Sequence, residues 1–279
     1  DAQPTSDVVL SVSSGDTGEA TVSPATLTFT PGNWNSAQTV TITGADDSLV
    51  DGSQTSILTI SVVDGSSDND FDGINDQTVS VETTDDDSVG FTLVESLGST
   101  GVDESGTTDT FTVVLNVQPS SDVVFSISSS DTGEATVTSS LTFTSSNWDT
   151  PQTITVTGVD DNIIDGTQTS TITISIVDGS SDDDFDDVAD RSVSVSTTDD
   201  DVAGFTITET DGSTSVDESG TTDTFTIVLN AQPDSDVVLS ISSGDTGEAT
   251  VTSTLTFTSA NWDTPQTVTV TGADDGLID

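Results

Sequence analysis

Apolar residues alternate with serine and threonine along most of this chain. The stretch DTFTVVLN (109–116) is an example, with Phe, Val and Leu at every second position. A period of two is typical of β-strands that bury one face and expose the other. Within one unit the pattern predicts seven or eight strands, at GFTLVES (90–96), DTFTVVLN (109–116), DVVFSISS (122–129), EATVT (134–138), LTFTS (141–145), QTITVTG (152–158), TSTITISIV (169–177) and RSVSVST (191–197). No stretch has the spacing of an amphipathic helix.

The chain repeats itself with a period close to 114 residues. The motif NW-x-[ST] recurs at Trp34, Trp148 and Trp262. The motif DTGEATV also occurs three times, beginning at Asp16, Asp131 and Asp245. Solenoid repeats are about 20–50 residues long, whereas this period is the size of an independent domain. The repeat therefore predicts separate domains in tandem.

The strand pattern and the repeat together predict an all-β fold, with tandem immunoglobulin-like antiparallel β-sandwiches arranged end to end. Residues 88–201 form one complete repeat. Residues 1–87 form a partial repeat without its first strands, and residues 202–279 form a partial repeat without its last strands. Such partial repeats leave sheet edges and cores open, so we expect the chain to be an excerpt of a longer tandem array.

The composition is strongly acidic. The chain has 50 Asp and Glu residues, and Arg191 is its single cationic side chain, for a net charge of −49. Anionic partners such as nucleic acids would be repelled, and no apolar run approaches the ~18 residues of a membrane span. Without Lys, His, Cys or Tyr, no Ser or Thr has a nitrogen base to activate it, and zinc or copper lacks its usual ligands. We therefore expect that the chain is not an enzyme.

Three acidic patterns recur in the repeat, and they are candidates for ion binding. They are VDESGT, VDDNIIDG and TTDDDVAGF in the complete unit. Adjacent carboxylates repel one another by about 1 kcal/mol per pair at 4 Å in water, and by more where water is excluded. Apart from Arg191, the chain offers no cationic side chain to relieve that repulsion. Carboxylates are hard oxygen ligands of the kind that Ca²⁺ prefers, so the patterns predict calcium sites.

These three patterns, in this order on this series of strands, resemble the Calx-β domain. The resemblance covers the whole repeat and is nearest to the tandem Calx-β-like repeats of giant bacterial surface adhesins and extracellular fibre proteins. It implies a seven-stranded sandwich that binds calcium at one end, beside the linker to the next domain.

The resemblance also implies a set of calcium ligands. In the complete unit these are Glu104, Asp160, Asp161, Asp165, Asp199, Asp200 and Asp201. In the partial repeats they are Asp46, Asp47, Asp51, Asp85, Asp86, Asp87, Glu218, Asp274, Asp275 and Asp279. Asp131, with Asp16 and Asp245, corresponds to a further loop aspartate of the family. Asp165 stands where the family often has Glu, so its carboxylate reaches one methylene less far.

A second acidic loop follows the pattern D-x-D-x-D and is a separate candidate for an ion. Its carboxylates are Asp68, Asp70, Asp72 and Asp76 in the first repeat, and Asp182, Asp184, Asp186 and Asp190 in the second. The start resembles a calcium loop, but Val79 or Val193 stands where a bidentate Glu is expected. The alternative is a hydrated loop with Phe71 or Phe185 in the core.

Near-identical acidic repeats are typical of a shaft rather than of a tip. We therefore expect a calcium-stiffened structural repeat, extracellular and on a bacterial cell surface, that forms the shaft or spacer of an adhesin or fibre. Its expected partners are neighbouring repeats of the same longer chain and other such rods in fibres. Two alternatives stay open: a ligand-binding adhesion module, and a halophilic acidic surface-layer protein without specific calcium sites. The halophilic alternative predicts acids on the strand faces, which here carry Ser and Thr.

Overall fold

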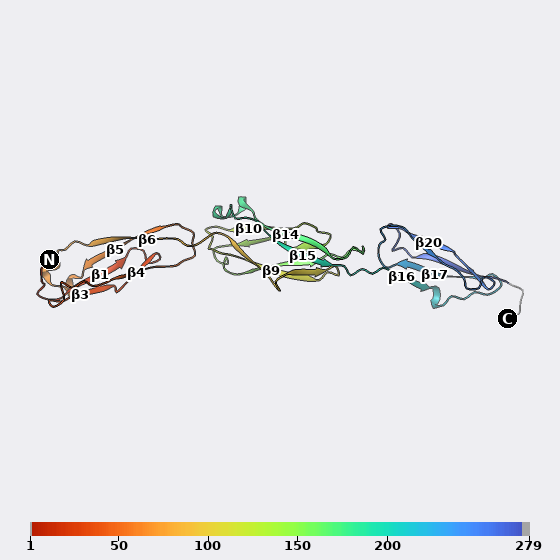
Figure 1. The fold of residues 1–279 in the computed structure, drawn as a ribbon, viewed down its shortest axis with the longest axis horizontal. Coiled ribbons are helices and arrows are strands. Elements are labelled where there is room, and N and C mark those ends of the chain that lie inside the picture. Colours follow the sequence, from red (N-terminus) through yellow and green to blue (C-terminus); the bar gives the residue numbers. More distant parts are fainter. Residues whose placement is uncertain (1, 275–279) are drawn as a thin grey trace.

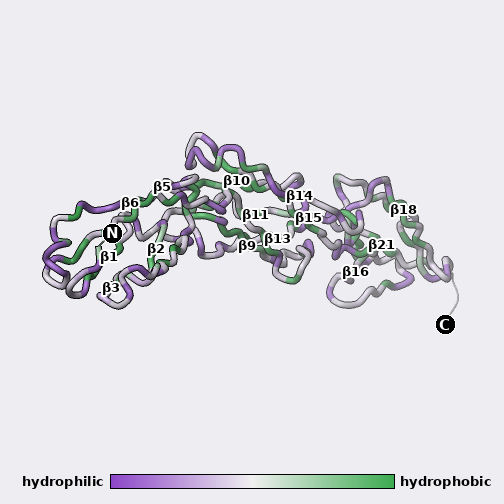
Figure 2. The backbone as a smooth tube through the Cα atoms, turned by 60° about the vertical axis from the view of Figure 1, so that its left-hand side comes forward, coloured by the Kyte–Doolittle hydropathy of each residue, from purple (hydrophilic) through white to green (hydrophobic). Residues whose placement is uncertain are grey.

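The computed structural model of this protein describes residues 2–274. Three groups of strands follow one another along the longest axis, with the first unit at one end and the third at the other (Figure 1). Hydrophobic stretches run along the strands, and hydrophilic stretches gather in the loops (Figure 2). The alternation in the sequence therefore folds into sheets with one apolar face, as predicted.

The middle unit is a complete β-sandwich. Its elements are β7 (Phe91–Glu95), β8 (Thr100–Asp103), β9 (Thr108–Leu115), β10 (Val123–Ser129), β11 (Ala135–Val137), β12 (Ser140–Phe143), β13 (Gln152–Gly158), β14 (Gln168–Ile176), η3 (Asp178–Ser180), η4 (Asp183–Phe185) and β15 (Arg191–Thr198). One sheet has the order β12-β10-β14-β15-β8, and the other has the order β11-β13-β9-β7. This is the predicted all-β sandwich.

Strand β8 departs from the predicted pattern in two ways. The sequence analysis predicted no strand there, and β8 pairs with β15 in parallel, with Thr100 opposite Val195 and Asp103 opposite Thr198. The sandwich is therefore not wholly antiparallel. The short stretch TGVD contains Gly101, so it carries little alternation of its own. It becomes a strand because the edge of β15, far away in the sequence, is free to pair with it.

Phenylalanine rings fill the centre of the middle unit. The Phe91 and Phe125 rings meet edge to face at 5.0 Å, and the Phe125 and Phe143 rings do so at 5.8 Å. All three side chains are at most 1% exposed. The guanidinium of Arg191 lies 5.3 Å from the centre of the Phe91 ring. The single cationic side chain is therefore used for packing against an aromatic ring.

The described part of the first unit has four of the five strands of one sheet and two of the four strands of the other. Its elements are β1 (Val8–Ser14), β2 (Ala20–Ser23), β3 (Thr26–Phe29), β4 (Thr41–Gly44), β5 (Gln54–Val62), η1 (Asp64–Ser66), η2 (Asn69–Phe71) and β6 (Gln77–Thr83). The sheets are β3-β1-β5-β6 and β2-β4. No described strand corresponds to β7, β8 or β9. Strand β4 is consequently shorter than its counterpart β13, which pairs with β9 over six residues.

The third unit is open on the opposite side. Its elements are β16 (Phe205–Glu209), η5 (Thr210–Gly212), β17 (Thr222–Leu229), β18 (Val237–Ser240), β19 (Ala249–Val251), β20 (Thr254–Phe257) and β21 (Gln266–Gly272). The sheets are β16-β17-β21-β19 and β18-β20. Phe205 is 50% exposed, whereas its counterpart Phe91 is 1% exposed. The segment matching β8 is not a strand here, because the described residues contain no counterpart of β15 for it to pair with.

Successive units touch through one repeated backbone contact. The Gln118 N–H of the middle unit donates to the Ser48 carbonyl of the first unit at 2.9 Å. The Gln232 N–H of the third unit donates to the Asn162 carbonyl of the middle unit at 2.7 Å, and Gln232 forms a parallel β-bridge with Ile163. Each unit therefore holds the next through the acidic loop that follows β4 or β13.

The helices in the described part of the chain are three-residue 3₁₀ segments. None is long and apolar enough to cross a membrane.

Candidate metal centre

Three carboxylates meet at the end of the middle unit that faces the third unit. Glu104 follows β8, Asp161 follows β13 and Asp201 follows β15. One carboxylate oxygen from each lies within 4.8 Å of the others. Segments that are far apart in the sequence thus bring their acids to one point.

Glu104 is placed there by a tight turn packed against β13. The turn contains Gly106 at a φ of +90°, and the Glu104 N–H donates to the Thr198 carbonyl at 3.1 Å. A Cβ atom added at Gly158 of β13 would collide with the carbonyl oxygen of Asp103. The absence of a side chain at Gly158 therefore allows the turn to approach β13 closely. Glu104, which this turn carries, is 1% exposed.

The cluster contains buried carboxylate oxygens without hydrogen-bond partners. They are both side-chain oxygens of Glu104, Oε2 of Glu134 and Oδ2 of Asp201. A buried acceptor left unsatisfied costs about 1–3 kcal/mol, and more when it is charged. In folded proteins, buried carboxylate oxygens of this kind usually interact with a proton, a water molecule or a cation. The donor set here, made of hard oxygens, fits calcium.

Asp199 organises the two loops around this cluster. Its Oδ2 accepts from the Gly166 N–H at 2.8 Å, and its Oδ1 accepts from the Asp201 N–H at 2.8 Å. Asp161 Oδ1 accepts from the Ile163 N–H at 2.6 Å. The acidic loop after β13 is therefore tied to the linker that leaves β15.

Crowding of acids changes the affinity of the cluster for protons. Desolvation by burial, followed by the charges of Asp161 and Asp199, raises the pKa of Glu104 to about 7. Desolvation is also the largest cause of the raised pKa of Glu134, and of the raised pKa of Asp201. Without an ion, the site therefore holds protons at a pH at which an ordinary carboxyl is ionised.

This shift predicts how ion-free stability depends on pH. The pKa of Glu104 rises from 4.5 to about 7 on folding, so the folded state binds more protons between these values and loses stability as the pH rises through 7. Carboxyls with lowered pKa, such as Asp182, titrate below this window. We expect the melting temperature of the calcium-free middle unit to fall from pH 5 to pH 8.

Saturating calcium and the variant Glu104→Gln should each weaken this pH dependence. Thermal melting followed by Trp148 fluorescence measures it, with Trp34 and Trp262 replaced by Phe. A calcium-free chain that melts at the same temperature at pH 5 and pH 8 would contradict the expectation.

The other predicted ligands of the middle unit lie at the rim of the cluster. Asp160, Asp165 and Asp200 are exposed and belong to the same two loops. Asp131 is also exposed, and its Oδ1 accepts from the Gly133 N–H at 2.9 Å within its own turn. Its role as a ligand stays a prediction.

Glu134 is a site residue that the sequence analysis missed. It immediately precedes β11. Desolvation by burial, followed by the charges of Asp165, Asp131, Asp161 and Asp199, raises its pKa. A signal was present, because all three copies of DTGEATV keep this Glu.

The first unit gathers its predicted ligands in the same way. A small hollow of about 30 Å³ is lined by Glu19, Asp46, Asp47, Asp51, Asp85, Asp86 and Asp87, among other residues. Asp85 Oδ2 accepts from the Gly52 N–H at 2.8 Å, which matches the contact between Asp199 and Gly166. Glu19 occupies the place of Glu134, and no described residue occupies the place of Glu104.

The third unit holds only part of the set. Glu218 and Glu248 line a common hollow, but Glu218 is exposed whereas its counterpart Glu104 is buried. Asp274 is described, while Asp275 and Asp279 lie outside the described residues. Glu218 lacks the cover that the turn after β8 receives from β15 in the middle unit.

The second acidic loop is used differently. Asp182 Oδ2 accepts from the Ser120 hydroxyl and from the Ser121 N–H, both at 2.8 Å, and its Oδ1 accepts from the Asp184 N–H. Asp68 makes matching contacts with Thr5 and Ser6, and these hydrogen bonds lower its pKa to about 2. Phe185 is buried, as the hydrated-loop alternative expects. Among the described residues, the three-carboxylate group lies at Glu104 instead, and an ion at the second loop stays a prediction.

Comparisons with known proteins give loose structural likenesses. No protein-family model matches the chain, and no curated protein matches it. Among solved structures, it is similar to domains 4–9 of surface layer protein SbsC, with 15% identity and a TM-score of 0.34, covering 99% of this chain and 36% of that chain. It is also similar to the apo-form Calx CBD1 domain, with 16% identity and a TM-score of 0.30, covering 40% of this chain and 98% of that chain.

A further similar structure is the calcium binding domain CBD12 of CALX1.1, with 16% identity and a TM-score of 0.30, covering 66% of this chain and 76% of that chain. At TM-scores of this size, the likenesses transfer neither a ligand nor a function to this chain.

Proposed function

We propose that this chain is a non-catalytic, calcium-stiffened structural repeat of an extracellular surface fibre or adhesin shaft. One observation carries the proposal: buried, unpartnered oxygens of Glu104 and Asp201 lie at the junction with the next unit. A cation bound there binds the folded junction and not the unfolded chain, so it stabilises the junction by mass action.

The structure suggests how ion binding would reach the next unit. Asp199, Asp200 and Asp201 form the start of the linker to β16, so an ion that they bind fixes the linker to the body of the middle unit. Asp161 lies in the loop whose next residue, Asn162, accepts the hydrogen bond from Gln232. Both connections between the units, covalent and non-covalent, therefore leave from ligand-bearing segments.

The stiffening is tested on the whole chain by small-angle scattering with calcium and with a chelator. We expect calcium to lengthen the maximum dimension and to reduce the flexibility between units. Without an ion, the carboxylates at the junction repel one another, so the two units are free to move relative to each other. Calorimetry on the same samples counts the ions bound. An equally extended and rigid particle in chelator contradicts the proposal, and so does an equal effect of magnesium at the same concentration.

A further inference from the structure

A Gln-Pro pair occurs three times in the chain, in the loop that precedes β1, β10 or β18. In the middle and third units, the backbone N–H of this Gln makes the contact with the preceding unit. A residue before proline favours extended backbone, and extended backbone is what the parallel β-bridge between Gln232 and Ile163 requires. The pair is therefore suited to donate a backbone hydrogen bond to a neighbour.

The side chain of the same Gln is bound to its own unit. Gln118 Nε2 donates to the Ser145 carbonyl at 2.7 Å. Gln232 Nε2 donates to the Ser259 carbonyl at 3.1 Å. Each Gln thus has two separate tasks, because its side chain holds it on the body of its own unit and its N–H is left for the preceding unit.

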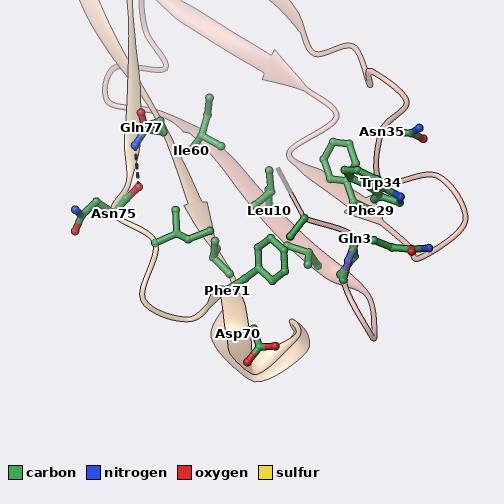
Figure 3. Close-up of a pocket in the computed structure, with 15 residues that line it drawn as sticks. Gln3, Leu10, Phe29, Trp34, Asn35, Ile60, Asp70, Phe71, Asn75 and Gln77 are labelled. Carbon is green, nitrogen blue, oxygen red and sulfur yellow. Dashed lines mark hydrogen bonds between the residues drawn. The ribbon is translucent and has the colours of Figure 1, made fainter.

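The first unit contains the same side-chain anchor. Gln3 Nε2 donates to the Pro31 carbonyl at 2.9 Å, and Gln3 and Trp34 line the same hollow (Figure 3). The loop that accepts this bond is fixed in turn, because Asn33 Oδ1 accepts from the Thr30 N–H at 2.5 Å. The matching bond in each of the other two units is 2.6 Å long. The anchor is therefore a property of the repeat, and it holds the Gln backbone in a defined place.

The carbonyl that accepts the Gln N–H is fixed by an aspartate of the candidate metal centre. Asp161 Oδ1 accepts from the Ile163 N–H at 2.6 Å, which closes a tight turn around Asn162. The first unit repeats this turn, with Asp47 Oδ1 accepting from the Leu49 N–H at 2.8 Å. One loop therefore carries both a carboxylate of the candidate centre and the acceptor for the next unit.

The contact between units is uncharged, which matters in a chain with a net charge of −49. Salt bridges between units would need cationic side chains, and the single one, Arg191, packs against the Phe91 ring. A hydrogen bond between backbone groups needs no cation. Salt also screens it much less than it screens the attraction between exposed charges.

We propose that Gln118 and Gln232 are docking residues that fix the orientation of each unit on the preceding one. The side chain positions the residue, and its N–H binds the turn of the preceding unit. This turn also carries a ligand of the ion, on the proposed function, so docking and ion binding stabilise each other. Because such coupling is reciprocal, docking raises the calcium affinity of the junction by the same factor by which calcium strengthens docking.

Two substitutions separate the backbone donor from the side chain. Gln232→Pro removes both the N–H and the side chain, whereas Gln232→Ala removes only the side chain. The whole chain has no Cys, so spin labels can be attached at Thr171→Cys and Thr256→Cys, two exposed strand positions. Pulsed dipolar spectroscopy of this pair measures the distribution of distances between the middle and third units.

In calcium, we expect a narrow distribution for the chain with Gln232, a broader one for Gln232→Ala and the broadest for Gln232→Pro. In chelator, all three should broaden. Calorimetry should show that Gln232→Pro raises the calcium Kd of this junction by about fivefold relative to Gln232→Ala, the effect of losing one hydrogen bond of ordinary strength.

The other junction supplies the matched control. Gln118→Pro should broaden the distances between labels at Thr55→Cys and Thr171→Cys, and it should leave the distances between the middle and third units unchanged. If the fluorescence of Trp262 shows that Gln232→Pro unfolds the third unit, the α-hydroxy analogue of glutamine at residue 232 takes its place. That analogue keeps the side chain and lacks only the N–H.

The docking proposal is overturned if removal of the N–H has no effect of its own. This result would be the same distribution and calcium Kd for Gln232→Pro and Gln232→Ala, or for the α-hydroxy analogue and the unsubstituted chain. The proposed function fails in a different way, with identical distributions in calcium and chelator and no ion detected by calorimetry. In that case, the difference between the proline and alanine variants still decides whether the Gln N–H docks the units.

Discussion

Replacing Asp199, Asp200 and Asp201 together by Asn should abolish calcium binding at the junction between the middle and third units. The substitution keeps a similar shape but removes three charges, including that of Asp201, whose Oδ2 is buried without a partner. At ~1 mM calcium and a Kd of ~10⁻⁴ M, each lost site removes about 1.4 kcal/mol of stabilisation. A junction with two sites would therefore lose about 3 kcal/mol.

The first unit provides the matched control for this variant. Replacing Asp85, Asp86 and Asp87 by Asn should abolish binding at the other junction and leave the middle unit's site intact. Calorimetry should show each variant losing its own share of the ions, and scattering should show one loosened junction in each. If the variant of residues 199–201 still binds the full complement, the assignment of ligands is wrong.

Replacing Gly158 by Ala should disrupt the candidate metal centre without changing a carboxylate. The new Cβ atom would overlap the carbonyl oxygen of Asp103, so the turn that carries Glu104 must move away from β13. Overpacking of a buried backbone contact costs about 1–3 kcal/mol, occasionally more. We expect the middle unit to lose about 3 kcal/mol of stability and the site to lose most of its calcium affinity.

Gly44 is the counterpart of Gly158 in the first unit, and Gly44→Ala is the matched control for Gly158→Ala. A Cβ atom there would meet Cγ2 of Thr83 at 3.7 Å, which is ordinary contact, because the first unit has no described counterpart of β8. Gly44→Ala should therefore change stability by no more than about 0.5 kcal/mol. Denaturant unfolding followed by the tryptophan of each unit compares the two variants. Equal losses of stability in the two variants would show that the close approach of the turn does not explain the need for glycine at residue 158.

Much of the fold could be predicted from the period of two in the sequence. Strands such as β9 and β14 carry seven or more residues of β-branched and apolar alternation, which leaves little choice of conformation or of buried face. Strand β8 could not be predicted this way. Its four residues form a strand through a parallel ladder with β15, and no local pattern encodes a partner about 95 residues away.

The residues of the candidate site also differ in how far the sequence alone could identify them. The triplet at residues 199–201 and the pair Asp160 and Asp161 were visible as runs of acids. The sequence could not rank them, because exposure separates Asp200 from Asp201 although they are neighbours. Glu134 was missed because a single Glu beside a strand is unremarkable until the loops fold over it.

Residue type and local spacing are enough to predict the strands other than β8, the repeat, the excess of negative charge and the oxygen-only chemistry of any ion site. Which acids come together at the candidate metal site depends on the tertiary structure. Burial, followed by the charges of neighbouring acids, raises the pKa of Glu104 to about 7. The equivalent Glu218 is exposed, because the described part of the third unit has no counterpart of β15 to cover its turn. Desolvation and convergence are properties of packed segments that are distant in sequence, and here they gather acids from several runs of charge into one candidate cation site.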